Sequence, residues 1–481
     1  MKIPTTLQGP WRGATPARTV PTLCLAAGIA GLVLPAQAQQ VGDDGKLGDV
    51  PADNEVQHQT GTYIDTICPQ MAELNRQGQL NAPQQRLLNR CGGAKFNIGR
   101  EGFTEGDATG VLQRLSPEET LTIGSNHTDT ALKDQLGTRF SALRAGVTGV
   151  SIGGVAQAEH GIYTGGSAGV DDGAPWGFFL NGVYSTGDKD GDENEDQFDF
   201  DAYGLTTGLD YRLSESLVVG VAYGYVDADA DIDDGKGAVS SGNGGAGDSE
   251  QDTETHTLAL YGTWYSGNVY FDGSVAWSQS EIDGERSIQY GFVNQAAEMS
   301  TDSDQLAISV GGGFNHHLGG PWNTRYFLRS DYVDAEVDAY RERARQRSAE
   351  GADPANPAQD LDSLIMQVDD QEIESWQSVL GVNLTYVQSV DYGVLTPYVT
   401  AAWHHEFEDD SRLITAKYVF DPTNDVLRFR SSAADEDFFG LSVGVSSVLA
   451  NGTQWFVNYD TVLGLDDVSQ HIFTGGFRVS F

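Results

Sequence analysis

Three sets of side chains in this sequence have types and spacings that could support catalysis or metal binding. The first, Gly165-Gly166-Ser167-Ala168-Gly169, matches G-x-S-x-G, the nucleophile elbow that exposes a serine on a strained turn between a strand and a helix. Here the run lies in a connector rich in Gly, Ala and Ser, where such a turn is not expected. We therefore predict no nucleophilic serine at this position and no enzymatic activity.

Two histidine pairs, His316-His317 and His404-His405, form the second set, and Glu406 follows the second pair. Side chains of neighbouring residues in a β-strand point to opposite faces, so adjacent histidines cannot easily share one metal ion. We interpret both pairs as residues near the rims of a sheet, and we predict no metal centre and no cofactor.

The third set is an acidic run with oxygen ligands at alternate positions, as in calcium-binding loops. The candidate ligands are Asp188, Asp190, Asp192, Asn194 and Asp196. The EF-hand spacing is not met, because Gly191 comes too early and no Glu occupies the twelfth position. A solvated acidic loop is the preferred interpretation, and weak calcium binding is the alternative.

The composition excludes several classes of protein. The chain has 481 residues, a formal net charge of -41 and a mean hydropathy of -0.34. Nucleic acid is not an expected partner, because phosphate recognition requires clustered Lys and Arg. No interior run of about 18 apolar residues occurs, which excludes a helical membrane protein. A transmembrane β-barrel passes this test undetected, since half of each strand is polar.

The first 38 residues have the features of a signal peptide. Basic residues precede the apolar stretch 23–34, and a small-residue motif ends at Ala38, which predicts cleavage between Ala38 and Gln39. Cleavage leaves Cys68 and Cys91 of the three cysteines. In an oxidising compartment such a pair is expected to form a disulfide, and a metal site is the less favoured alternative.

The pattern after the signal peptide is first polar and then helical. Residues 39 to about 60 are expected to be unstructured. Residues 64–90 predict a short helical hairpin, which the disulfide would staple. A further helical stretch, 108–121, has Ser116 as a cap before Pro117. Leu132, Leu136, Phe140 and Leu143 recur at helical spacing, and a Gly-rich connector follows.

From Trp176 onward the apolar period becomes two, which is typical of strands. The final segment alternates Phe473, Gly475, Phe477, Val479 and Phe481 with small or polar residues and continues to the last residue printed. A bare apolar edge invites aggregation, whereas a closed barrel has no edge. Alternation alone does not decide which face is outside.

The connections decide the architecture. About twelve strands are separated by connections that are alternately long and short, the outer-membrane barrel pattern of extracellular loops and periplasmic turns. An even number of strands places both ends of the barrel in the periplasm. The expected long loops are 187–200, 227–254, 280–303, 334–373, 407–436 and 462–469. They carry most of the acidic residues, and we expect them to stay hydrated and to be able to bridge divalent cations at a lipopolysaccharide surface.

Charged residues also fall on the face expected to line the lumen. They are Asp210, Arg212, Asp272, Arg325, Arg329, Asp331 and Arg478. Charges are permitted there because the lumen is wet or plugged. We hypothesise that some of them hold a helix, Ala131–Arg144, in the pore. The alternative is that they line a hydrated channel.

Several motifs together resemble the autotransporter (type V secretion) family over about residues 172–481. They are Trp176-Gly177-Phe178-Phe179, Thr206-Thr207-Gly208-Leu209-Asp210-Tyr211-Arg212, Leu258-Ala259-Leu260-Tyr261-Gly262-Thr263-Trp264, Pro397-Tyr398 through Trp403-His404-His405-Glu406-Phe407, and Gly475-Gly476-Phe477 to Phe481. Upstream, Leu136, Arg139, Leu143 and Arg144 resemble the linker helix that threads such barrels.

The resemblance implies an all-β transmembrane antiparallel barrel of about 12 strands, with a small α-helical N-terminal region and a pore-threading linker helix. It also implies that Phe477, Val479 and Phe481 form the signal read by the barrel-assembly machinery. The implied function is to translocate or anchor the chain's own short N-terminal region at the surface of a Gram-negative-type cell. The alternative is a porin or adhesin-like scaffold whose N-terminal region stays periplasmic or plugs the lumen.

The expected organisation is a signal peptide (1–38), a short helical passenger-like region (39–124), a linker helix (125–146), a Gly-rich connector (147–173) and the barrel (174–481). The expected partners are outer-membrane lipid, lipopolysaccharide, the barrel-assembly machinery and periplasmic chaperones. The barrel itself is expected to be monomeric.

Overall fold

The structure is a computed structural model. It describes residues 47–50, 52, 54–97, 111–117, 156–158, 161–163, 175–192, 194, 196–232, 249–290, 293–345 and 362–480. The described residues all belong to one compact unit, 41–481.

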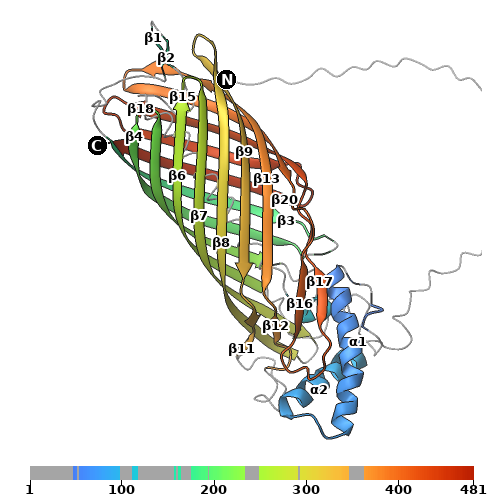
Figure 1. Cartoon of the computed structure of the whole chain (residues 1–481). Helices are drawn as coiled ribbons and strands as arrows, with labels where there is room; N and C mark the ends of the chain where they lie inside the picture. Colours follow the sequence, from blue (N-terminus) through green and yellow to red (C-terminus); the bar gives the residue numbers. More distant parts are fainter. Residues whose placement is uncertain are drawn as a thin grey trace, which may run out of the picture. The chain divides into compact units, whose positions relative to one another are not determined.

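Twelve strands form a closed antiparallel barrel (Figure 1). They are β3 (Trp176–Lys189), β4 (Phe198–Ser214), β5 (Leu217–Ile232), β6 (Ser249–Ser266), β7 (Val269–Tyr290), β8 (Val293–Gly319), β9 (Trp322–Val337), β13 (Gln371–Tyr386), β15 (Gly393–Glu406), β18 (Asp437–Leu449), β19 (Gln454–Leu463) and β20 (Val468–Ser480). The final strand β20 pairs with both β19 and β3, and β8 pairs with β9, so the sheet closes on itself. The predicted fold class is confirmed.

The alternation along each strand sorts large apolar side chains outward and small or polar ones inward. On β6, Leu258 is 53% and Leu260 is 65% exposed, whereas Thr257 and Thr263 are buried. Aromatic pairs such as Trp264 with Phe271 lie near the ends of this apolar surface. An apolar outer band bordered by aromatic residues is the surface that a barrel presents to a bilayer.

The two ends of the barrel differ. At one end, which we call the short-turn end, hairpin turns join successive strands, and Gly267 takes a positive φ of 58° between β6 and β7. The barrel also begins and ends here, because Gly177 pairs with Ser480 and Trp176 pairs with Tyr211 beside the β4–β5 turn. We call the opposite end the long-loop end.

One expected long loop is mostly strand. The segment 280–303 was predicted as a loop, but β7 continues to Tyr290 and β8 resumes at Val293. The prediction was wrong because it ended the strands where the apolar alternation ends. Neighbouring strands pair through backbone hydrogen bonds, so the sheet can continue beyond the apolar band. Beyond the apolar band the outward residues of β7 become acidic, as at Glu281 and Asp283, while Ile282 and Ile288 are buried on the inner side.

Two other expected loops also contain regular structure. A four-stranded sheet forms at the long-loop end from β10 (Tyr340–Arg341), β12 (Met366–Val368), β16 (Leu413–Tyr418) and β17 (Leu427–Arg430). Three further pairings involve β11 (Arg343–Arg345) with β8, β14 (Gln388–Val390) with β15, and β1 (Ala156–Ala158) with β2 (Gly161–Tyr163). The segments 334–373 and 407–436 are therefore not simply hydrated loops.

The N-terminal region folds into two helices, α1 (Glu55–Arg76) and α2 (Ala82–Asn97). The side chain of Asn54 caps α1 by accepting a hydrogen bond from the backbone N–H of Gln57 at 3.0 Å. The expectation of an unstructured segment to about residue 60 was thus wrong for 55–60, where the cap and tertiary packing outweigh a polar composition. None of the helices among the described residues is long and apolar enough to cross a membrane.

A further helical turn spans residues 111–115, and Ser116 follows it. The Ser116 Oγ donates to the carbonyl of Leu112 at 2.8 Å, so this serine closes the turn that precedes it. Ser116 was predicted to cap a helix that follows, but residues 118–120 lie outside the described part of the chain.

Candidate functional site

The N-terminal helices share one apolar core with the sheet and strand extensions of the long-loop end. The helical side contributes Leu47, Ile64, Ile67, Met71, Leu87, Leu112 and Leu115. The barrel side contributes Ile282, Ile288, Leu364, Met366, Ile414, Tyr418, Leu427 and Phe429. Ile67 and Met71 are completely buried, and Phe429 is 1% exposed. Burial of this kind stabilises each large side chain by about 1.5–3 kcal/mol, so the helices and the long-loop end stabilise each other.

A buried ion pair lies inside this interface. The guanidinium of Arg286, on β7, donates to both carboxylate oxygens of Glu342 at 2.9 and 2.6 Å. It also donates to the carbonyls of Arg114 and Ser116 at 3.2 and 3.3 Å and to that of Leu364 at 3.2 Å. Because the side chains are only 4% and 6% exposed, the pair is stable only while these partners are in place.

Two tyrosines extend the polar contacts. The Tyr63 hydroxyl on α1 donates to Asp421 Oδ2 at 2.8 Å and accepts from the Tyr418 backbone N–H at 3.3 Å. The Tyr418 hydroxyl donates to the carbonyl of Leu115 at 3.1 Å. Burial, reinforced by the Asp421 charge, raises the pKa of Tyr63 above its ordinary value. Tyr63 therefore remains a donor at physiological pH.

Polar contacts at the edge of the interface fix the orientation of the helices. Arg86 on α2 forms a two-point pair with Asp362 at 2.8 and 3.0 Å. Asn54 donates to Asp196 Oδ1 at 2.9 Å, in the connection between β3 and β4. Partly exposed pairs of this kind contribute little energy, so their role here is to fix geometry.

A disulfide joins α1 to α2. Cys68 and Cys91 are bonded, as predicted, with their Cα atoms 5.8 Å apart and both side chains buried in the shared core. The bridge closes a loop across the helical hairpin and restricts its unfolded state. The helical hairpin that packs against the long-loop end is therefore held together by a covalent bond as well as by apolar contacts.

The structure places the seven predicted lumen residues on the inward face of the barrel wall. Asp210 accepts from Arg478 at 3.2 Å, and Arg329 pairs with Asp331 at 2.7 Å. Asp272 accepts from Thr263 at 2.6 Å. Arg212 and Arg325 are half-buried on the same face. The part of the inner wall nearer the short-turn end is therefore polar and cross-linked. The helix Ala131–Arg144 that these residues were expected to hold lies outside the described residues.

The five calcium candidates do not gather around one point. Asp192 accepts from Lys189 at 3.3 Å and from the Ser432 hydroxyl at 2.5 Å, while Asp196 contacts Asn54 of the helical region. Within the described part of the chain, three metal-ligating side chains come together at two places, and neither includes Asp188, Asp190, Asp192, Asn194 or Asp196.

The predicted histidine pairs point in different directions. His317 contacts Asn323 at 2.7 Å near the short-turn end, and His316 stacks on Phe314. His405 faces Glu436 and Asp437, at one of the two metal-competent places. Sequence reasoning missed this cluster because its acidic members lie at the start of the neighbouring strand β18, Glu436 just before it and Asp437 as its first residue, and not beside the histidines in the chain.

Some predicted positions lie outside the described residues. These are the cleavage site Ala38–Gln39, the G-x-S-x-G run at 165–169, the linker residues Leu136, Arg139, Leu143 and Arg144, and Phe481. Of the proposed assembly signal, Phe477 and Val479 are described, and both face outward at 42% and 37% exposure.

Comparison with known proteins gives one family match. The family model described as the autotransporter β-domain matches residues 178–460. A comparison with curated proteins finds no match. The family assignment therefore rests on the family model, which covers more than half of the chain.

Among solved structures, the translocator domain of NalP from Neisseria meningitidis is similar at 13% identity and a TM-score of 0.48, with 74% of this chain and 98% of that chain covered. The β-domain of the Bordetella autotransporter BrkA is similar at 16% identity and a TM-score of 0.42, with 64% of this chain and 100% of that chain covered. The transport unit of the autotransporter AIDA-I from Escherichia coli is similar at 14% identity and a TM-score of 0.42, with 64% of this chain and 90% of that chain covered.

Proposed function

We propose, since this chain belongs to the autotransporter β-domain family, that its barrel translocates its own N-terminal region across the outer membrane and retains it as a folded cap on the cell surface. The family implies an outer-membrane barrel. Export by the signal peptide, passage of the N-terminal region and its retention are the proposal.

The observation that carries the proposal is the shared core between the helices and the long-loop end. Long loops of outer-membrane barrels face the exterior and short turns face the periplasm. Met71 and Phe429 belong to the same buried cluster, so the N-terminal helices fold against the exterior end. Strand β3, however, starts at Trp176 at the short-turn end. In the proposed topology, the chain between these points therefore crosses the membrane.

The polar inner wall near the short-turn end supports passage through the barrel. Irregular backbone does not cross hydrocarbon in contact with lipid, because its polar groups would lack partners. Residues 118–174 connect the helical region to β3, and an extended chain of that length reaches about 190 Å. A strand of 22 residues such as β7 spans about 73 Å, so the connection is long enough.

Retention follows from the type of interface. Removal of the helices would expose Tyr418, Phe429 and Leu364 to water, and soluble surfaces rarely carry contiguous apolar patches of this kind. Assembly would require the barrel-assembly machinery and periplasmic chaperones, and lipopolysaccharide would surround the band. These partners belong to the proposal.

The test is protease access in intact cells. A protease site is inserted in the exposed turn Gln77–Gln79 between α1 and α2 and, as a matched control, at Gly267 in the β6–β7 turn. We expect cleavage at 77–79 in intact cells and at 267 only after the outer membrane is permeabilised. Protection of both sites until permeabilisation would refute surface display. The barrel would then be a porin or scaffold with a periplasmic N-terminal region.

A further inference from the structure

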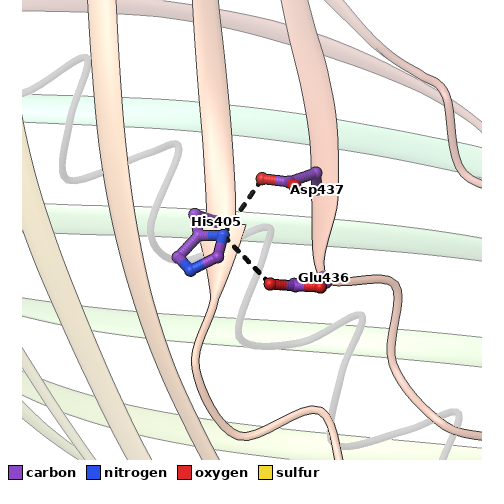
Figure 2. A group of neighbouring side chains, drawn as sticks. All are labelled: His405, Glu436 and Asp437. Carbon is purple, nitrogen blue, oxygen red and sulfur yellow. Dashed lines mark hydrogen bonds and ion pairs between the residues drawn. The ribbon is translucent and has the colours of Figure 1, made fainter.

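A separate cluster of side chains lies on the outer face of the barrel, at the start and end of the 407–436 connection. His405 is the penultimate residue of β15, Asp437 is the first residue of β18, and the strand register pairs them directly. Figure 2 shows the imidazole facing the carboxylates of Glu436 and Asp437. The Nδ1 atom lies 3.0 Å from Asp437 Oδ1 and 4.0 Å from Glu436 Oε1.

Aromatic neighbours hold this imidazole in place. The Phe407 ring meets it edge-on at 4.6 Å between centroids, and the Trp403 ring lies 5.7 Å away. The Trp403 Nε1 also donates to Asp437 Oδ1 at 2.8 Å. Partners that orient a ligand from outside are a common feature of metal sites, because they fix the ring and carboxylate before the ion arrives.

The spacing of the donor atoms fits one ion. Ligands held at about 2.1 Å from a metal lie about 3.0–3.4 Å from one another. The three donor atoms lie within 4.8 Å of one another. His405 Nδ1 and Asp437 Oδ1 share a hydrogen bond at 3.0 Å, a spacing that two ligands of one ion also have, so the ion would take the place of the Nδ1 proton, which is released to water. The Oε1 atom of Glu436 lies 4.0 Å from Nδ1 and has to come about 0.6–1 Å closer to it, which a side chain that is 62% exposed to water can do.

The donor types select the class of metal. An imidazole nitrogen with two carboxylates suits Zn²⁺ and other first-row divalent ions, whereas Ca²⁺ and Mg²⁺ prefer oxygen alone. The other cluster, Asp334 with Glu372 and Glu374, contains carboxylates only. We propose that His405, Glu436 and Asp437 bind a Zn²⁺-class divalent ion on the outer rim of the barrel and leave coordination positions open.

The position of this site gives it a structural consequence that goes beyond translocation. His405 and Asp437 flank the connection that carries β16 and β17, which cover the N-terminal helices. The strand register already joins the two ends of this connection, so a bound ion adds its restraint at Glu436, which lies just before β18, and at the residues next to it. Zinc should therefore slow hydrogen exchange at Glu436 and the residues next to it as well as bind.

The experiment titrates Zn²⁺ alone into the full chain, folded in detergent and freed of metal with a chelator, by calorimetry. We expect one site, affinity at least tenfold weaker in His405→Gln and in Asp437→Asn, and unchanged affinity in His256→Gln. His256 is the matched control because it is an exposed histidine on the outward face of β6 that belongs to neither cluster. Hydrogen exchange at Glu436 and the residues next to it should slow with Zn²⁺ in the wild type and not in His405→Gln.

Two results would overturn the proposal. One is wild-type affinity in a folded His405→Gln barrel. The other is no binding by the wild type at about 100 μM Zn²⁺, which would place Kd above any useful range. The heat-dependent gel mobility of folded barrels verifies each variant. If His405→Gln does not fold, Asp437→Asn and displacement of Zn²⁺ by equimolar Ca²⁺ decide the question, since a histidine-dependent site resists displacement.

Discussion

Each long barrel strand has a part near the short-turn end, which we call the lower part and which is drawn at the top of Figure 1, and a part near the long-loop end, which we call the upper part. The two parts use opposite faces for apolar side chains. In the lower part of β7, Phe271 and Trp277 point outward at 58% and 49% exposure, while Ser274 and Ser278 are buried inside. In the upper part, Glu281 points outward and Ile282 and Ile288 are buried inside.

Strand β9 reverses in the same way. Tyr326 and Leu328 are exposed outward in its lower part, whereas Val333, Ala335 and Val337 are buried inside its upper part. Apolar residues still recur at every second position in both parts, so the secondary structure is the same. What differs between the two parts is the medium that the outer face contacts. In the proposed outer-membrane position, lipid surrounds the lower part and water surrounds the upper part, where the N-terminal helices supply the apolar side chains that fill the interior.

The variant with the largest expected effect tests the apolar core that the N-terminal helices form with the upper part of the barrel. Glu342→Ala removes the carboxylate that neutralises Arg286 and leaves a buried, unpaired guanidinium. Breaking one partner of a buried pair costs about 3–5 kcal/mol. We expect rapid proteolysis of residues 54–97 in intact cells while the barrel keeps its heat-dependent gel mobility.

The matched control for this change is Arg345→Gln, which breaks a pair with Glu285 that is partly exposed. Its expected cost is at most about 1 kcal/mol. If both variants leave the helices equally protected, the shared core does not depend on the buried ion pair.

Removing the disulfide with Cys68→Ser and Cys91→Ser should loosen the same region by about 2–5 kcal/mol, because the unfolded hairpin gains freedom. Hydrogen exchange in α1 and α2, followed as the denaturant concentration rises, measures this loss of stability. The lower part of the barrel should exchange as in the wild type. Equal loss of protection in β4 or β19 would mean that the two parts unfold as one unit.

A third prediction tests whether the outer face of the lower part contacts lipid. Leu260→Arg puts a charge near the middle of the apolar band, where the expected cost is about 2–4 kcal/mol in a bilayer. Glu254→Arg is the control, on the same face of β6 but in the acidic region, where it should be neutral or slightly stabilising. Urea unfolding in lipid vesicles gives both values. Equal costs would refute the assigned boundary between the two parts.

The smallest effect concerns the acidic outer surface of the upper part. Asp229 lies directly opposite Asp252 in the register, and like charges in that position destabilise a sheet. Partial burial, with the hydrogen bond and charge of Asp252, raises the pKa of Asp229.

A raised carboxyl pKa means that the folded state holds its proton at a pH where the unfolded state has lost it. Stability from this group therefore falls as pH rises from about 3.8 through the folded-state value. Asp229→Asn should stabilise the upper part by about 0.5 kcal/mol or less at pH 7. At pH 3 it should have no effect. Thermal melts at the two pH values test this, and an equal shift at both would contradict it.

Much of the fold could be predicted from the sequence. Alternation and loop lengths predicted twelve strands, because a lipid-facing strand must repeat every two residues wherever it stands in the chain. The disulfide followed from a cysteine count and an export signal. The ends of the strands could not be predicted in this way: polar residues at 280–303 are typical of loops, and only pairing with neighbouring strands shows that they continue the sheet.

The candidate sites were less accessible to sequence reasoning. Arg286 and Glu342 are 56 residues apart, and neither stands in a motif. His405 was considered with its chain neighbours, His404 and Glu406, although its partners, Glu436 and Asp437, lie about 30 residues away at the start of β18. Cross-strand register creates these contacts, and register is set by the whole sheet.

The sequence by itself determined that this chain forms a closed barrel with a helical, disulfide-containing N-terminal region, because periodicity and cysteine number are local properties. The tertiary structure alone decided where the helices pack. Their apolar face is covered by Tyr418 and Phe429, from a connection more than 300 residues later. Burial between such distant segments depends on the closed barrel bringing them together, and no local pattern records it.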